Sequence, residues 1–110
     1  MHATLTRNGP KNVVVIVQGD GEGEYTLHPK SLGGCTSIKL DQIIYAIESG
    51  VKIRLAWTED GVLLPLEGRG FLNYDSVESL QASSIGQGLT VQAQGSGVYH
   101  IVLDLTKQGQ

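Results

Sequence analysis

Short apolar runs separated by glycine-rich turns recur along the chain, and this pattern predicts a sheet protein. Asn12 to Gln18 is a run dominated by β-branched residues, which predicts a strand covered on both faces. Val51 to Trp57 alternates apolar and polar residues with a period of two, as a strand with one buried face does. The next apolar run is Val62 to Leu64. Pro65 follows it, and this proline either ends the strand or restricts it to the edge of a sheet.

The C-terminal part of the chain alternates in the same way. Leu89 to Gln94 and Tyr99 to Leu105 are joined by Gly95-Ser96-Gly97, so we predict a C-terminal hairpin. Shorter strand candidates are Thr4 to Thr6, Glu24 to Leu27 and Gly70 to Tyr74. The alternation predicts one core that includes Tyr99, Ile101, Leu103, Leu105, Val51, Ile53, Leu55 and Trp57.

Leu40 to Ile47 fits two patterns. Leu40, Ile43, Ile44 and Ile47 have the spacing of an amphipathic helix that ends at Gly50. The same residues fit a strand if a β-bulge at Asp41 brings the two halves of the run into phase. Three Ile and a Tyr within five residues favour the strand, because β-branched residues lose side-chain freedom in helices.

About eight short strands result, and they predict an all-β fold, an antiparallel β-sandwich of jelly-roll-like form. An immunoglobulin-like sandwich fits the same strands. The length of 110 residues is that of a single domain, residues 1–110. Residues 1–11 are polar and precede the best strands, which makes them a candidate for an extended N-terminal arm.

The composition and charge restrict the classes of partner that we expect. Charged residues are only 17% of the chain and glycines number 15, which suits a sheet better than a helical bundle. The net charge is −3 and the eight Lys and Arg are scattered, so we expect no nucleic-acid partner. No window approaches the ~20 apolar residues of a membrane span. The first ten residues contain no apolar stretch and Cys35 is the lone cysteine, so we expect no signal peptide and folding in a reducing cytoplasm.

The acidic turn after the first long run is the most suggestive local motif. Asp20, Glu22 and Glu24 fall at alternate positions, as the first ligands of a calcium loop do. The sixth position is Tyr25 instead of Gly, and the twelfth is Ser31 instead of Glu. We therefore interpret the stretch as a solvated turn and expect no metal and no cofactor.

No pattern of catalytic residues stands out. His2, His28 and His100 are far apart in the chain, and His100 with Asp104 fits an ordinary surface pair on one strand face. Cys35 has no basic neighbour and fits a small core or interface residue. No nucleophile-elbow motif surrounds any of the serines Ser31, Ser37, Ser83, Ser84 and Ser96.

Two further residues have plain structural interpretations. Trp57 closes an alternating strand, which favours a core anchor over a stacking platform. Arg69 lies between Gly68 and Gly70, which favours an exposed hairpin loop.

The eleven acidic residues contain no recognisable glycosidase pair. We expect a protein that is not an enzyme and has no catalytic residue.

Taken in order, several segments resemble a group of small structural proteins of tailed bacteriophages and prophages. The pattern N-G-P-[KR]-N-V-V-V is Asn8 to Val15. I-x-L-D-x-I-x-Y-x-I followed by V-x-[IVL]-R-L-x-W is Ile38 to Ile47 and then Val51 to Trp57. G-R-G-x-[LM]-[ND]-[FY] is Gly68 to Tyr74, and I-V-L-[DE]-L-x-K-x-G is Ile101 to Gly109.

The resemblance implies a capsid decoration (cement) protein. Such proteins are β-sandwiches or jelly rolls that sit on the outer surface of the head as dimers or trimers and clamp neighbouring capsid subunits. The implied partner is the phage major capsid protein, the implied assembly is a homodimer or homotrimer, and the implied location is the virion. The candidate contact segments are polar and long for turns: His2 to Lys11, Gly19 to Gly34 and Asn73 to Gly88.

Two other functions fit the sequence. One is a tail or neck component of the same virion. The other is a carbohydrate-binding sandwich that serves adhesion, although the chain has only one Trp, four Tyr and one Phe for a sugar platform. An enzyme ranks third.

Overall fold

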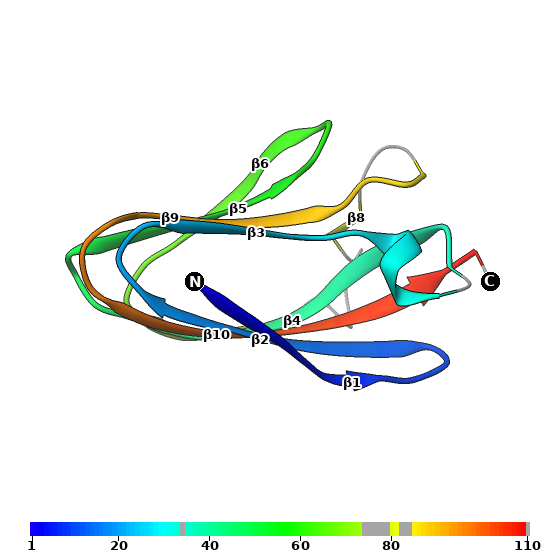
Figure 1. The fold of residues 1–110 in the computed structure, drawn as a ribbon, viewed down its shortest axis with the longest axis horizontal. Coiled ribbons are helices and arrows are strands. Elements are labelled where there is room, and N and C mark those ends of the chain that lie inside the picture. Colours follow the sequence, from blue (N-terminus) through cyan, green and yellow to red (C-terminus); the bar gives the residue numbers. More distant parts are fainter. Residues whose placement is uncertain (34, 74–79, 82–84, 110) are drawn as a thin grey trace.

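Two antiparallel sheets face each other in the computed structural model, which describes residues 1–33, 35–73, 80–81 and 85–109 (Figure 1). Across sheet A lie β1 (His2–Asn8), β2 (Asn12–Asp20), β10 (Val98–Gln108), β4 (Ser37–Ile47) and β7 (Arg69–Asn73), with the short β8 (Leu80–Gln81) also paired to β4. Across sheet B lie β3 (Gly23–Leu27), β9 (Leu89–Gly95), β5 (Val51–Trp57) and β6 (Gly61–Leu66). One 3-10 turn, Pro29–Leu32, follows β3. The predicted all-β antiparallel sandwich is confirmed.

The core lies between the sheets, and alternation specifies it. Every second residue of β5 and of β10 is buried, and all eight residues predicted for the core are in it. Val13, Val15 and Val17 of β2 are completely buried in the same core. The outer side chains of β2 are half-buried or exposed, so the prediction that this strand is covered on both faces is wrong. Its continuous β-branched run reflects an outer sheet surface that is itself apolar.

Four connections cross between the sheets at one end of the sandwich, which we call the turn end. They join β2 to β3, β4 to β5, β6 to β7 and β9 to β10. The predicted C-terminal hairpin is therefore wrong, because β9 pairs with β3 and β5 while β10 pairs with β2 and β4. Alternation shows that a strand has one buried face, but it does not show to which sheet the strand belongs.

Hydrogen bonds tie the crossing turns to one another. The Ser96 amide donates to the Gly50 carbonyl at 2.9 Å, and the Gly21 amide donates to the Gly97 carbonyl at 3.0 Å. A Cβ at Gly50 would overlap the Ser96 carbonyl oxygen, and one at Gly95 would overlap the Gly50 carbonyl oxygen. The two turns approach this closely only because both positions are glycine.

The ambiguous segment is a strand with a bulge, as predicted. In β4, Gln42 lies opposite Asp104 and Leu40 lies opposite Leu105, so Asp41 is the extra residue. Its carboxylate accepts a hydrogen bond from the Thr106 hydroxyl and lies 4.0 Å from the Lys39 ammonium. These partners satisfy a carboxylate that is only 6% exposed.

The N-terminal segment is part of the sheet. Residues 2–8 pair with β2 and form the edge strand β1, so the suggested extended arm for residues 1–11 is wrong in this structure. Polar edge strands are common because charged and polar side chains discourage further pairing. Pro65 lies within β6 at the edge of sheet B, as predicted. Tyr74, the predicted end of the strand at 70–74, lies outside the described residues.

Two tyrosines lie across glycines of the neighbouring strand. Tyr99 of β10 pairs with Gly19 of β2, and Tyr45 of β4 pairs with Gly70 of β7. A Cβ at position 19 would lie 2.5 Å from the Tyr99 hydroxyl oxygen, and one at position 70 equally close to that of Tyr45. Each glycine leaves the space that the ring occupies, a pairing that helps to fix register.

Gly19→Ala should lower the free energy of unfolding by about 1–3 kcal/mol, because the new methyl group overlaps a buried ring. Gly9→Ala is the matched control, since a Cβ there meets its nearest atom at 3.6 Å. Chemical denaturation measures both. In a Tyr99→Phe background, the loss of stability caused by Gly19→Ala should be smaller. An unchanged loss would show that the clash with the Tyr99 hydroxyl does not cause it.

Candidate binding surfaces

The outer face of sheet A carries apolar side chains that follow one another across four strands. Val102 of β10 lies opposite Ile16 of β2 on one side and Ile44 of β4 on the other. Ile44 in turn lies opposite Phe71 of β7. Each alternates with inward-facing neighbours, which places it on the side turned away from sheet B. We call Ile16, Val102, Ile44 and Phe71 the apolar row.

The apolar row is unusual for an outer sheet face. Ile44 is 48% exposed and Phe71 is 53% exposed, while Ile16 and Val102 are half-buried between their neighbours. Antiparallel sheets with one solvated face normally carry polar residues there. Single exposed apolar residues need no explanation, but a continuous row of them is a candidate contact surface.

Two mostly polar rows flank the apolar row, one on each side. Toward the turn end the cross-strand neighbours are Gln18, His100, Ala46 and Arg69. Toward the other end they are Val14, Asp104, Gln42 and Asn73. β1 extends the first row by His2 and the second by Arg7. On the middle strand β10, an imidazole and a carboxylate therefore lie on opposite sides of Val102.

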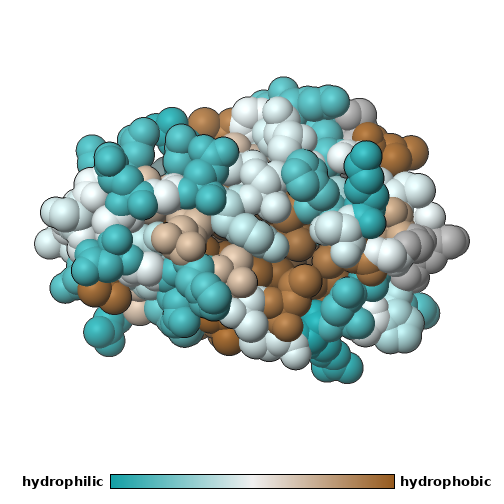
Figure 2. All heavy atoms as spheres, in the orientation of Figure 1, coloured by the Kyte–Doolittle hydropathy of each residue, from teal (hydrophilic) through white to brown (hydrophobic). Residues whose placement is uncertain are grey.

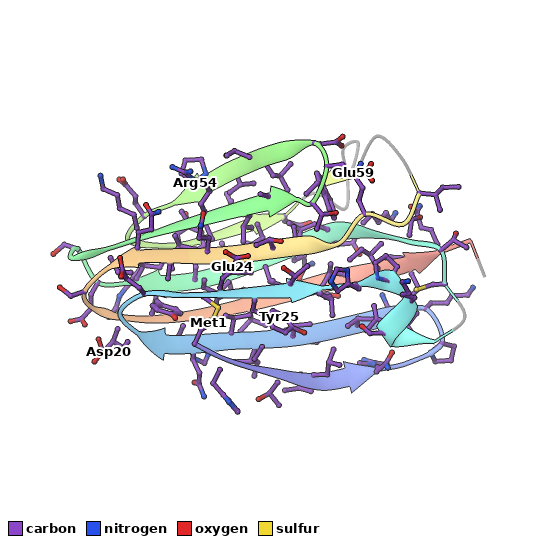
Figure 3. The ribbon with its side chains drawn as sticks, turned by 45° about the horizontal axis from the view of Figure 1, so that its top comes forward. Met1, Asp20, Glu24, Tyr25, Arg54 and Glu59 are labelled. Atoms are coloured by element: carbon purple, nitrogen blue, oxygen red, sulfur yellow. The ribbon has the colours of Figure 1, made fainter. Side chains whose placement is uncertain are left out.

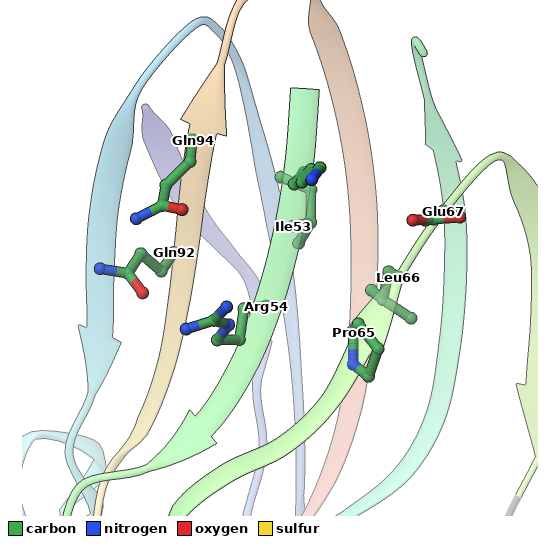
Figure 4. A pocket seen from close by; sticks show the side chains of 8 residues that line it. Ile53, Arg54, Pro65, Leu66, Glu67, Gln92 and Gln94 are labelled. Carbon is green, nitrogen blue, oxygen red and sulfur yellow. The ribbon is translucent and has the colours of Figure 1, made fainter. Parts of the chain in front are cut away.

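The outer face of sheet B is polar by contrast. Glu24, Gln92 and Arg54 are cross-strand neighbours there. The hydroxyls of Thr26 and Thr90 are hydrogen-bonded at 2.9 Å. A cavity of about 80 Å³ lies between β9, β5 and β6, with the Arg54 side chain directed toward Gln92 (Figure 4). Ligand pockets usually measure about 300–1,000 Å³, so this cavity is too small for an ordinary organic ligand.

The seam between the sheets exposes apolar side chains along the β1 edge. At this edge sheet A has an additional strand, β1, while sheet B ends at β3. Leu5 of β1 is 42% exposed because no strand of sheet B covers it. Met1, Ala3 and Tyr25 pack partly buried against the core nearby. Figure 2 shows brown apolar atoms between the two layers on this side.

The end of the sandwich opposite the turn end, which we call the loop end, is braced by buried polar side chains. The Lys107 ammonium donates to the Leu32 carbonyl at 3.0 Å. The Gln87 carboxamide oxygen accepts from the amides of Glu59 and Asp60 at 3.0 and 3.1 Å, and its nitrogen donates to the Asp60 carboxylate at 3.1 Å. Such bonds hold loops in one conformation, because an unpaired buried group costs free energy.

The loop end brings together parts of all three predicted contact segments. The first supplies the turn at 9–11, the second the 3-10 turn at Pro29–Leu32, and the third residues 85–88. Lys107 donates its amide to the Lys11 carbonyl, and Gly86 donates its amide to the Thr36 carbonyl. Ile85 is 75% exposed at this end. Residues 34, 74–79 and 82–84 of these segments lie outside the described residues. Most of the first two segments is regular structure rather than long loop.

A hollow of about 430 Å³ opens at the turn end beside sheet A. Arg69, His100 and Glu48 line it together with Val98, which is 54% exposed. The hollow continues the polar row that contains His100. Arg69 begins β7 after a crossing turn, so the predicted hairpin loop around it is wrong, although its side chain is exposed as expected.

The acidic turn spans the end of β2 and the start of β3. Asp20 ends β2 and Glu24 lies on β3, and their side chains point to separate places (Figure 3). In the parts of the chain that the structure describes, no three His, Cys, Asp or Glu residues are grouped to hold a metal ion. The expectation that no metal or cofactor binds stays a prediction.

The structure places the remaining candidates in three regions. His2 and His100 lie in one row of sheet A with Gln18 between them, and His28 precedes the 3-10 turn. The Cys35 thiol is buried and donates to the Pro29 carbonyl at 3.2 Å, and Trp57 is buried in the core, as predicted for both. Of the five serines considered, Ser31 lies in the 3-10 turn, Ser37 at the start of β4 and Ser96 in a crossing turn; Ser83 and Ser84 lie outside the described residues.

Sequence reasoning missed the apolar row. Its signal was present, because Ile16, Ile44 and Val102 occupy the outward phase of their strands. Only the register of four strands from distant parts of the chain shows that they form one surface.

Comparisons with known proteins give no relative: no family model, no curated protein and no solved structure matches the chain. Among the described residues, no helix has the length and apolar character needed to cross a bilayer.

Gln87→Ala should lower the free energy of unfolding by about 2 kcal/mol, because it leaves the Glu59 and Asp60 amides without this partner. Gln94→Ala, at an exposed position of β9, should change it by less than about 0.5 kcal/mol. Equal effects of the two substitutions in chemical denaturation would show that Gln87 does not brace the loop end.

The buried hydroxyl of Tyr99 should make the protein less stable at alkaline pH. Burial raises the pKa of its hydroxyl, and the negative charge of Asp20 adds to the rise. Above about pH 10 the unfolded chain releases this proton while the folded chain retains it, so stability falls as pH increases. Tyr99→Phe should lose less stability than the wild type between pH 8 and about pH 10.5 in chemical denaturation. Identical losses would contradict the assignment.

Proposed function

We propose that the chain is a structural protein of a tailed bacteriophage that binds the outside of the assembled head and joins neighbouring major capsid subunits. The sequence resemblance to small phage structural proteins supports this proposal. The loop end supports it most strongly, because it presents three segments from distant parts of the chain on one braced surface.

The strand order supports a jelly roll as the finer description of the sandwich. Without β1 and β8, the order β2-β10-β4-β7 faces the order β3-β9-β5-β6. Successive strands cross between the two sheets at the turn end, as expected for eight strands wound as two Greek keys. Jelly rolls occur in viral capsid domains but also in lectins and enzymes. The fold therefore does not identify the function, which must be inferred from the binding surfaces.

The loop end has the properties of a protein-binding surface. Its base is held by Lys107 and Gln87, so little conformational freedom is lost when a partner binds. Ile85 projects from it with 75% of its surface exposed, which provides an apolar anchor.

The proposed role follows from mass action. A protein that binds only the assembled head stabilises that head by the free energy of its binding. Each small contact is weak, but simultaneous contacts with two subunits multiply the affinity. Isolated capsid subunits offer only one such contact.

The experiment is co-sedimentation of the purified chain with expanded heads that lack it, taken from the phage or prophage whose genome encodes it. The chain should bind heads, should not bind isolated capsid subunits, and should raise the temperature at which heads break open. Ile85→Glu should weaken head binding at least about tenfold, because it charges the anchor.

Gln94→Glu is the control, since it also adds a carboxylate at an exposed position but lies next to the turn end, on the outer face of sheet B. Heads that are no more robust with the chain than without it, or equal binding to free subunits, would overturn the proposal.

A further inference from the structure

We propose that the outer face of sheet A is a self-association surface, on which a second copy of this chain stacks so that the two apolar rows face each other. This inference concerns a different surface from the loop end and does not depend on head binding.

The apolar row lies where a symmetric contact needs it. β10 is the middle strand of the path β1-β2-β10-β4-β7, and Val102 of β10 lies between Ile16 and Ile44 in the row. A twofold axis through Val102 therefore places one apolar row over the other. In a closed twofold dimer the same surface serves both protomers. Contact removes the exposed surfaces of Ile44 and Phe71 from water.

The face is large enough for a dimer. The face is five strands wide, with strands about 4.8 Å apart, and extends along β10 from residue 98 to residue 106. These dimensions give a planar area of roughly 600 Å² on each protomer. Projecting side chains make the accessible area larger, so it approaches the roughly 800 Å² per partner of a standard interface. This size fits a dimer whose Kd is on the order of micromolar.

Charge complementarity selects the second copy as occupant and fixes its direction. Two aligned stackings keep the apolar rows in contact. If the axis runs along β10, His100 faces the partner's His100 and Asp104 faces the partner's Asp104, and the two carboxylates repel. If the axis runs along the apolar row, each His100 faces the partner's Asp104, and the imidazole N–H donates to the carboxylate.

The second arrangement is the one we propose. At β1, Arg7 would face the partner's His2, but the twist of the two sheets separates them toward this edge. The two loop ends then point in opposite directions, because the axis reverses the strands. A dimer built this way presents one loop end on each flank.

Analytical ultracentrifugation over a concentration series tests the surface. The wild-type chain should form dimers as concentration rises, and Ile44→Glu should weaken dimerisation at least about tenfold, because the axis brings two introduced charges together. Val62→Glu is the control, since Val62 is 59% exposed but lies on β6 in the other sheet. A wild-type monomer at all concentrations, or equal effects of the two variants, overturns the proposal.

A charge exchange tests the direction. His100→Glu should weaken dimerisation because it places two carboxylates opposite one another, and Asp104→Lys should weaken it because it removes the acceptor of the His100 N–H. The double variant should dimerise about as well as the wild type, and the two single variants should pair preferentially with each other when mixed. With the axis along β10, the double variant would keep like charges opposite one another, so a double variant that dimerises no better than His100→Glu would overturn the arrangement. Circular dichroism of each variant controls for folding.

If Ile44→Glu abolishes head binding while the wild type is monomeric, the row belongs to a capsid contact and the self-association proposal fails. If wild-type dimers form but no head binding is found, the proposed function fails and the dimer stands.

Discussion

The close contact between the turn before β5 and the turn before β10 determines how the rest of the molecule is arranged. The Ser96 amide reaches the Gly50 carbonyl because neither Gly50 nor Gly95 has a side chain. This contact directs β9 and β10 into opposite sheets, and the alternating residues of both strands then meet across one core. From this arrangement follow the central position of β10, the outward phase of Val102 and the gathering of the loops at the far end.

Much of the fold could be predicted from local pattern. Alternation in Val51 to Trp57 and Tyr99 to Leu105 identified both strands and the core, and the out-of-phase residues around Asp41 identified the bulge. The hairpin at Gly95 to Gly97 was wrong because two alternating runs with a short turn satisfy two topologies equally. What separates them is the contact with Gly50, which lies far away in the sequence. The extended arm was wrong for a similar reason, since the partner of the polar residues 2–8 is an edge that only the folded sheet provides.

The two binding surfaces were predictable to different degrees. Segment length and polarity indicated the three segments of the loop end, but Lys107 and Gln87, which brace this end, have partners that are distant in the chain. The apolar row could not be predicted, because Ile16, Ile44 and Phe71 become neighbours only through the register of β2, β10, β4 and β7. The two surfaces are complementary in the proposed role: one pairs two copies, and the other contacts the shell on each flank.

Electron cryomicroscopy of expanded heads saturated with the purified chain tests this account most directly. The account predicts additional density outside the shell that fits two copies stacked through sheet A, with Val102 on the twofold axis and each loop end against a different capsid subunit. Density that places the loop ends in solvent, or heads that carry no additional density at saturating concentration, would contradict it.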